Sequence, residues 1–329
     1  MRKLASIQRI KALDPIPNAD AIERATVLGW QLVVKKGEFQ VGDLCVYCEI
    51  DSLMPDRPEF EFLRPRGMRI RTVRLRGQIS QGICFPLEIL PAHVAIEEDT
   101  DVTEALAIEK YEPPMPASLA GVAKGPFPGF IPKTDETRVQ VLQERLDAFA
   151  GEPCYIAEKL DGTSVTFYLK DGEFGVCSRN LNLLDTPDNT LWKLARQYQI
   201  EDKLRALGSN FALQGEAVGE GIQSNKYQLK GQRVYFFNAF EIDKYRFADF
   251  EEFVQMMAGL GLETVPILDP HYTLVNDIPT LVELSVAAST LQPKVHREGI
   301  VIRPLKEKSD NLGRVSFKAI NPEFLLKYE

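Results

Sequence analysis

A stretch rich in proline and glycine divides the sequence at residues 113–132. It reads PPMPASLAGVAKGPFPGFIP and holds six prolines and three glycines. Proline fixes φ and removes a backbone donor, and glycine leaves the backbone unrestrained, so this composition is typical of a linker. We therefore expect a domain at residues 1–112, a linker at 113–132 and a second domain at 133–329.

The composition is that of an ordinary globular chain. Hydrophobic residues make up 44% of the 329 residues, and the net charge is −8. No apolar run reaches the length of about 18 residues that a membrane helix needs, and no signal peptide is evident, so we expect no membrane partner. Five scattered cysteines favour a reducing compartment, which predicts a cytoplasmic protein. The acidic balance argues against indiscriminate coating of nucleic acid but allows a local basic groove.

Short strands separated by glycine turns dominate residues 28–85. The segments 30–34, 44–50 and 69–76 each have a strand pattern. Strands of this length at close spacing predict a small barrel or sandwich.

Strands and helices mix after the linker. Asp171-Gly172 separates two β-rich runs, 164–169 and 173–178, and predicts a hairpin. Apolar spacing predicts helices over 137–149, 191–207 and 249–260, and strands over 232–242, 299–302 and 315–320. The second domain is therefore expected to be α+β rather than a regular βαβ repeat.

Lys159 ends an apolar run in the stretch YIAEKLDGTS, residues 155–164. A free lysine titrates at about pH 10.4, so it becomes a nucleophile only where burial or neighbouring cations lower its pKa. The neighbouring Asp161 would have the opposite effect. Taken alone, the stretch is also compatible with a solvated lysine that precedes a hairpin.

Five further motifs follow Lys159. Each places a charged or aromatic residue within or at the end of a strand: Ser178-Arg179-Asn180, Gly215-Glu216, Phe237-Asn238-Ala239-Phe240-Glu241, Arg297-Glu298-Gly299 and Phe317-Lys318. The predicted hairpin can return Arg179 toward Lys159. Individually, Phe240 could be a core residue, Glu298 a surface ion pair and Arg179 a loop cation, but the ordered set argues against chance.

These six motifs, in this order, resemble the nucleotidyltransferase domain of the covalent nucleotidyltransferases, which are the polynucleotide ligases and capping enzymes. The stretch GEAVGEGIQ (215–223) and Glu158 before the lysine are similar to the RNA ligase 2 branch. The N-terminal barrel and the stretch FIPKTDETR (130–138) resemble the Deinococcus-type RNA ligase. The resemblance implies an α+β chain, an OB-like β-barrel joined to an ATP-grasp-like ligase domain of antiparallel sheets with flanking helices.

The resemblance also implies a reaction and a set of roles. Lys159 would attack the α-phosphate of ATP, AMP would pass to a 5′-phosphate end, and a 3′-OH would then displace AMP. Phe240 would stack on adenine, Glu158 would contact its amine, and Arg179 and Lys318 would neutralise phosphate charge. Glu216 and Glu298 would hold the ribose or the waters of Mg²⁺ or Mn²⁺. The residues implied to bind ATP or AMP are Glu158, Lys159, Gly162, Arg179, Glu216, Phe240, Glu298 and Lys318.

The expected activity is ATP-dependent joining of RNA ends at nicks in duplexes, with RNA on the 3′-OH side, by a monomer that serves RNA repair. One departure is Ser316, which stands where many ligases carry the first lysine of a K-x-K motif. We expect no C-terminal domain after the last motif. The alternatives are a DNA ligase or guanylyltransferase, and a nucleic-acid-binding protein with an inactive transferase domain.

Residues 64–76, RPRGMRIRTVRLR, hold six arginines and no acid. On a strand they would form a basic stripe that suits a phosphate backbone; the alternative is an edge strand guarded by charge. Residues 1–112 hold 15 basic and 18 acidic residues, a net charge of −3, which does not decide between the two. We expect the barrel to recruit RNA, and the candidate contacts are Arg64, Arg66, Arg69, Arg71, Arg74 and Arg76.

Overall fold

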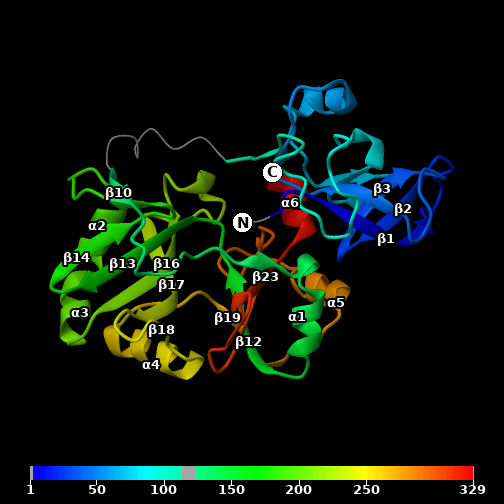
Figure 1. Cartoon of the computed structure of the whole chain (residues 1–329). Coiled ribbons are helices and arrows are strands. Elements are labelled where there is room, and N and C mark those ends of the chain that lie inside the picture. Colours follow the sequence, from blue (N-terminus) through cyan, green and yellow to red (C-terminus); the bar gives the residue numbers. More distant parts are fainter. Residues whose placement is uncertain (1–2, 113–122, 329) are drawn as a thin grey trace. The chain divides into compact units, whose positions relative to one another are not determined.

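The structure, a computed structural model, describes residues 3–112 and 123–328 (Figure 1). Its contacts divide the chain into two compact units, residues 1–114 with 322–329, and residues 115–321. Helix α6 (Pro322–Tyr328) thus groups with the first unit. Residues 113–122 of the expected linker lie outside the described residues, whereas β10 (Ala123–Pro126) is a strand. The functional division at 1–112, 113–132 and 133–329 stays a prediction.

The first unit is built on an antiparallel sheet in the order β3-β2-β1-β4-β8. The first half of β1 (Ala5–Pro15) pairs with β4 (Leu44–Cys48) and the second half with β2 (Ile22–Val27). A bulge between Ile10 and Ala12 separates the two halves, which bends the strand and curves the sheet. With β3 (Trp30–Lys35) and β8 (Ile83–Phe85), the sheet forms the nearly closed OB barrel that the sequence predicted.

Smaller elements decorate this barrel. They are β5 (Ser52–Leu53), which pairs with β9 (Glu109–Lys110), the 3₁₀ segments η1 (Pro58–Arg66) and η2 (Leu87–Ile89), and the hairpin of β6 (Val73–Leu75) and β7 (Gln78–Ser80). Arg76 and Gly77 turn that hairpin with positive φ at both residues, as a two-residue hairpin loop requires. Among the described residues, no helix is long and apolar enough to cross a membrane.

The second unit contains two larger sheets. One has seven strands, and its members are β10, β15 (Leu181–Leu183), β14 (Glu173–Cys177), β13 (Thr163–Lys170), β16 (Phe211–Gly219), β17 (Gln232–Glu241) and β18 (Arg246–Phe247). The other has five strands, β11 (Thr137–Arg138), β23 (Phe317–Ile320), β20 (Gly299–Pro304), β12 (Pro153–Lys159) and β19 (Ile267–Thr273). A two-stranded hairpin joins β21 (Ser309–Asp310) and β22 (Gly313–Arg314).

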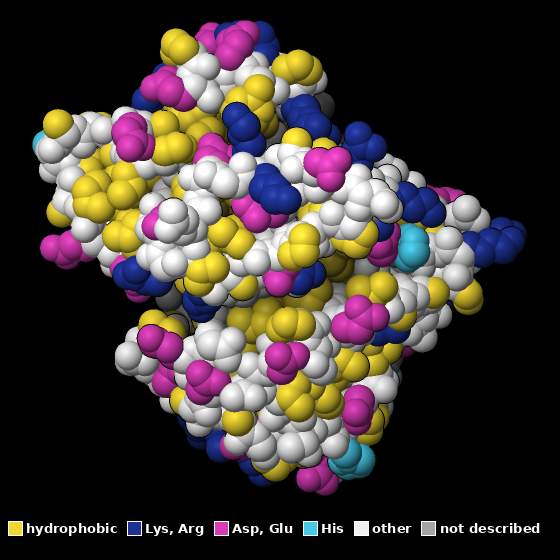
Figure 2. All heavy atoms as spheres, turned by 90° about the vertical axis from the view of Figure 1, so that its right-hand side faces the viewer, with side chains coloured by type: hydrophobic (Ala, Val, Ile, Leu, Met, Phe, Trp, Pro, Cys, Tyr) yellow, Lys and Arg dark blue, Asp and Glu magenta, His cyan; other side chains and the backbone are white. Residues whose placement is uncertain are grey.

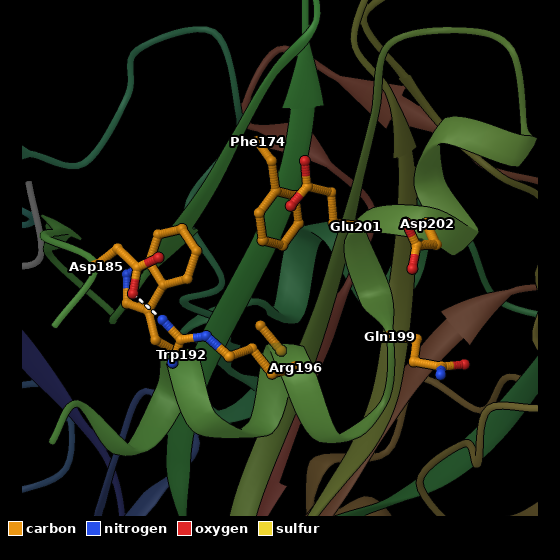
Figure 3. Close-up of a pocket in the computed structure, with 8 residues that line it drawn as sticks. Phe174, Asp185, Trp192, Arg196, Gln199, Glu201 and Asp202 are labelled. Atoms are coloured by element: carbon orange, nitrogen blue, oxygen red, sulfur yellow. Dashed lines mark hydrogen bonds and ion pairs between the residues drawn. The ribbon is translucent and has the colours of Figure 1, made fainter. Parts of the chain in front are cut away.

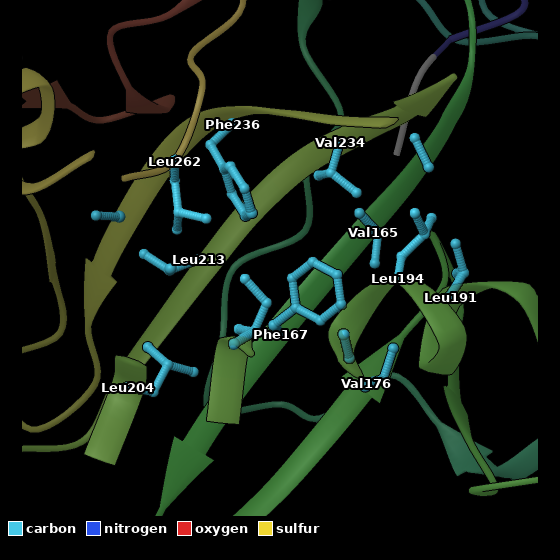
Figure 4. Close-up of a cluster of buried hydrophobic side chains, with 14 of the residues drawn as sticks. Val165, Phe167, Val176, Leu191, Leu194, Leu204, Leu213, Val234, Phe236 and Leu262 are labelled. Atoms are coloured by element: carbon cyan, nitrogen blue, oxygen red, sulfur yellow. The ribbon is translucent and has the colours of Figure 1, made fainter. Parts of the chain in front are cut away.

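Helices cover one face of each sheet. On the seven-stranded sheet, α2 (Thr190–Gln197), α3 (Ile200–Ala206) and α4 (Phe250–Leu260) enclose an apolar cluster that includes Phe167 and Phe236 (Figure 4). On the five-stranded sheet, the region of α1 (Gln143–Ala148) and α5 (Ile278–Leu284) encloses a second cluster. Side chains alternate between the two faces of a strand, so each sheet also has a face that these helices do not cover, and that face is available to motif residues.

Local features mostly follow the predictions. Asp171 and Gly172 turn the predicted hairpin, again with positive φ. Asp249 caps α4 through a capping box. The helix expected over 191–207 is divided into α2 and α3 because Gln199 has a φ of 51°. The helix expected over 137–149 begins instead as β11 and the 3₁₀ turn η4 (Val139–Val141).

Candidate active site

Lys159, at the end of β12, is bound by an acid from the neighbouring strand. Its Nζ donates to both carboxylate oxygens of Glu298, at 2.7 Å each. In the ladder between β12 and β20, Lys159 lies opposite Gly299, which directly follows Glu298. A side chain at Gly299 would lie 2.3 Å from the carbonyl oxygen of Ala319, so only glycine allows this close approach. The first and fifth motifs therefore meet at the end of β12.

Glu216 reaches the same place from the seven-stranded sheet. Its Oε1 accepts a hydrogen bond from the Gly162 amide at 3.1 Å. Gly162 lies where the chain passes from β12 to β13, and a Cβ there would lie 2.3 Å from the carbonyl oxygen of Ala217. This glycine thus lets β16 approach the end of β12, and the negative charge of Glu216 acts on Lys159.

The acids keep Lys159 protonated. Burial alone would lower the pKa of Lys159, but the charges of Glu298 and Glu216 outweigh it and raise that pKa above its ordinary value. Burial raises the pKa of Glu216 to about 8, with Lys159 opposing the rise and Glu298 adding to it. Lys159 can therefore attack an electrophile only after Glu298 has been drawn away from it and its proton has been lost.

Lys318 adds a second basic side chain, from β23. It lies opposite Val301 of β20 and pairs in parallel with Arg138 of β11. Burial, and then the positive charges of Lys159 and Arg138, lower the pKa of Lys318 to about 7. Cations gathered in a poorly hydrated place favour a bound anion, so the arrangement suits phosphate groups.

The buried side chain of Arg303 occupies the neighbourhood of Ser316. Its Nε donates to the Ser316 hydroxyl at 2.9 Å. Its Nη2 donates to Glu136 at 2.8 Å, and its Nη1 donates to the carbonyl oxygen of Phe237 at 2.9 Å. Arg303 therefore links the two sheets, and it places a paired guanidinium where the last motif lacks its first lysine.

The comparisons with known proteins agree with this geometry. An RNA ligase family profile matches residues 152–320, and an OB-fold domain profile matches residues 4–87. A mutant of Naegleria gruberi RNA ligase solved with ATP and Mn has a TM-score of 0.91 at 39% identity over 98% of both chains. This chain belongs to the RNA ligase family. The same enzyme solved with PPi matches equally well, with a TM-score of 0.91 and 39% identity over 99% of this chain and 98% of that one. The comparison with curated proteins found no match.

Phe240 of this RNA ligase is a core residue, which corrects the role expected for it. Its side chain is 1% exposed and packs edge-on against Tyr245 and Phe247, so neither ring face is open to a base. Phe237 is the better aromatic candidate. It is the extra residue of a bulge in β17. In the pairing with β16, Gln214 lies opposite Asn238 and the next residue, Gly215, lies opposite Phe236, so Phe237 has no partner in that strand. Bulges re-aim side chains, and Phe237 packs beside the apolar cluster that holds Ala157 and Leu160 of the lysine motif.

Glu158 does not join Lys159. Neighbouring side chains of a strand point to opposite faces, and Glu158 is buried on the other side of β12. Its carboxylate accepts hydrogen bonds from the Ser289 hydroxyl at 2.5 Å and from the Thr290 amide at 2.8 Å. Its contact with the adenine amine remains a prediction.

Arg179 is exposed beyond the hairpin and forms an ion pair with Asp135. The charge of Asp135 in turn acts on Lys318. Arg179 is thus connected to the site through Asp135, which precedes β11. The expected direct approach of Arg179 to Lys159 stays a prediction.

Sequence reasoning assigned no role to Asp161, Lys226 or Tyr227, which lie beside the lysine motif. Lys226 forms an ion pair with Asp161, and the hydroxyl of Tyr227 accepts a hydrogen bond from the Asp161 amide at 2.7 Å. The second and third of these residues come from the segment after the GIQ stretch, so only tertiary structure reveals them.

The acids of the site suit a hydrated divalent ion. Asp161, Glu216 and Glu298 present carboxylate oxygens, which Mg²⁺ and Mn²⁺ prefer, and their charges act on one another. Within the part of the chain that the structure describes, no group of three or more His, Cys, Asp or Glu residues could hold an ion directly.

The six arginines of residues 64–76 do not form a strand stripe. Arg69 is buried, and it binds Asp51 at 2.6 Å and stacks on the ring of Tyr111. Arg64 lies in η1 and is paired with Glu61 and Asp56.

Of the remaining arginines, Arg74 in β6 is paired with Glu323. Arg66, Arg71 and Arg76 are exposed in η1, a loop and the hairpin turn. Of the strand expected over 69–76 only Val73–Leu75 is formed, and the first part of the arginine run lies in η1, which contains Pro65 and ends at Gly67 in the left-handed conformation. On the face that Figure 2 shows, basic side chains are interspersed with acidic ones.

A surface pocket of about 270 Å³ lies between β14, α2 and α3 (Figure 3). It is lined by Phe174, Trp192 and the ion pair of Arg196 with Asp185. None of the residues predicted for catalysis lines it, so the geometry of the motifs, and not this pocket, locates the chemistry.

Proposed function

We propose that this chain is an ATP-dependent RNA ligase that joins 3′-OH and 5′-phosphate RNA ends through a covalent lysyl-AMP intermediate. The observation that carries the proposal is Lys159, held by Glu298 from its own sheet and close to Glu216 from the other sheet. The related Naegleria gruberi enzyme has been solved with ATP and Mn, with AMP and Mn, and with PPi, which are the co-substrate of such a first step, the nucleotide that it transfers and its leaving group.

In the first step, the neutral amine of Lys159 attacks the α-phosphorus of ATP. A phosphorus–nitrogen bond forms, the bond to pyrophosphate breaks, and the amine proton leaves to solvent or to an acid of the site. Lys318 and Arg138, which pair across neighbouring strands, would neutralise charge on the phosphates, which is the main demand of phosphoryl transfer. Phe237 would stack on the base.

A divalent ion, Mg²⁺ or Mn²⁺, would supply positive charge to the phosphates and compete with Lys159 for the acids. Glu216 and Glu298, together with Asp161, would hold it through water. Because Glu298 binds Lys159 with both of its oxygens, any cation that attracts Glu298 also weakens the grip on the amine. The pKa of Lys159 would then fall toward the range in which a nucleophile is present.

In the later steps, AMP passes to the 5′-phosphate of an RNA end and a 3′-OH displaces it. We propose nicks in duplexes as the substrate and RNA repair as the role, with RNA on the 3′-OH side. The OB unit would recruit RNA, with Arg66, Arg71 and Arg76 as its exposed candidate contacts. We further propose that the enzyme acts as a monomer in the cytoplasm.

Incubation with α-labelled ATP and Mn²⁺, followed by a denaturing gel, tests the first step. We expect label on the wild-type protein and none on Lys159→Ala, and more label from ATP than from GTP. A panel of nicked duplexes with RNA or DNA on each side of the break then tests the substrate. Failure of every nucleotide to label the protein would favour an inactive transferase domain.

A further inference from the structure

One acid of the site, Asp161, is already paired with a lysine, Lys226, that has no role in the steps above. Lys226 donates to the carboxylate of Asp161, and their side chains are only 16% and 18% exposed. Asp161 lies two residues after Lys159, and its carboxyl group feels the charges of both Glu298 and Lys159. The chain therefore neutralises one acid of the site with a cation of its own.

The segment that carries Lys226 has an uncommon backbone. Between β16 and β17, the residues Gln223, Ser224, Asn225 and Gln228 have φ values of 42°, 59°, 46° and 54°. Residues other than glycine rarely adopt positive φ, and such strain persists only where surrounding contacts hold it. Here the side chain of Asn225 bonds to both the amide and the carbonyl group of Leu229. These bonds hold the strained loop in a single conformation, which positions residues 226–228 beside the site.

Tyr227 fixes this loop independently of Lys226. Its side chain is 3% exposed within an apolar cluster, and its hydroxyl accepts the hydrogen bond from the Asp161 amide. Its carbonyl oxygen also accepts a hydrogen bond from Gln292 at 3.5 Å. With the neighbouring residue anchored, the long side chain of Lys226 can leave Asp161 while the loop stays in place.

We propose that Lys226 is a resident cation that occupies the Asp161 carboxylate until a divalent metal ion replaces it. The inference rests on the proposed function, which gives this site a metal-dependent reaction with ATP. An ammonium group and a hydrated divalent ion repel each other and compete for the same oxygens. Lys226 thus sets the metal concentration at which the site fills.

Direct metal binding tests the competition without reference to activity. Wild-type protein and Lys226→Ala, freed of AMP by pyrophosphate treatment, are titrated with Mn²⁺ and followed by electron paramagnetic resonance. We expect Lys226→Ala to bind Mn²⁺ about five-fold more tightly or better, as for two coupled ligands. In an Asp161→Asn background, the same substitution should leave Mn²⁺ affinity unchanged. Lys230→Ala, an exposed lysine of the same segment, is the matched control.

Equal or weaker Mn²⁺ binding by Lys226→Ala, including no measurable binding by either protein, would overturn the proposal. If Lys226→Ala lowers the thermal midpoint, Lys226→Met retains the stem of the side chain and should show the same gain in affinity. Labelling of the wild-type protein by α-labelled ATP is measured in parallel. Its absence would overturn the proposed function, whereas the Mn²⁺ titration decides the role of Lys226 alone.

Discussion

Truncation of Phe240 and of Phe237, two residues of the same strand, should affect different properties: the first should lower stability and the second should lower the affinity for ATP. Phe240 is 1% exposed, with ring centroids of Tyr245 and Phe247 at 5.2 and 4.9 Å, so Phe240→Ala leaves a cavity. A buried Phe→Ala change costs about 3–5 kcal/mol. For a unit of about 200 residues, each kcal/mol shifts the midpoint by about 2–4 °C, which gives a loss of about 6–20 °C. The affinity for ATP should change little.

Phe237→Ala should instead weaken ATP binding. Stacking of an aromatic ring on a base contributes about 1–3 kcal/mol, which corresponds to about a 5- to 150-fold rise in the KM for ATP during self-adenylylation. The thermal midpoint should fall less than for Phe240→Ala, because the Phe237 side chain is only partly buried. Phe237→Leu is the control, since it keeps apolar volume and removes the ring.

Differential scanning calorimetry and initial rates of labelling over a range of ATP concentrations measure both effects. The reasoning predicts a split, with stability lost in Phe240→Ala and ATP affinity lost in Phe237→Ala. A large rise in KM for Phe240→Ala at an unchanged midpoint would refute it and would restore the stacking role that the family resemblance implied for Phe240.

Three further predictions concern charge. Ser316→Lys, which restores the K-x-K pattern, should lower the free energy of unfolding by about 3–5 kcal/mol. The new ammonium would displace the paired Arg303 and face its guanidinium inside the protein. An unchanged midpoint in chemical denaturation would contradict this. Glu216 has a pKa of about 8 in the fold against an ordinary 4.5, so the folded protein keeps a proton that the unfolded chain releases. The free energy of unfolding should therefore fall as pH rises between these values, and Glu216→Gln should flatten the fall; a profile identical to that of the wild type would be inconsistent with the buried acid. Arg66→Ala should weaken RNA binding and reduce its salt slope by about 1, whereas Arg69→Ala should lower the thermal midpoint instead, since only Arg69 is buried against an acid; the reverse pattern would show that the two roles are misassigned.

The sequence predicted the parts of the site that depend on strand order. Lys159 and Glu298 meet because their strands are neighbours, and Gly162 and Gly299 leave the room that such close packing needs. The hairpin at Asp171 followed from short-range patterns of strands and turns, which also predicted a small barrel or sandwich at the N-terminus; the family resemblance implied that it is an OB-like barrel.

The role of Phe240 could not be judged from the sequence because a bulge changes the facing of β17, and alternation gives no sign of a bulge. The arginine stripe was wrong because Pro65 and Gly67 interrupt the run before it becomes a strand, and because Arg69 finds a buried partner in Asp51. The sequence around Lys226 does not indicate its importance. That importance comes from the ion pair with Asp161, which lies between β12 and β13, far from Lys226 in the sequence.

The central claim is that Lys159 becomes covalently linked to AMP. Intact-mass spectrometry of protein incubated with ATP and Mn²⁺ should show the gain of a single AMP, and peptide mapping should place it on residues 155–164 at the lysine. Lys159→Arg, which retains the positive charge, should show no gain. An adduct on another residue, or sealing of nicked RNA by Lys159→Arg, would contradict the account.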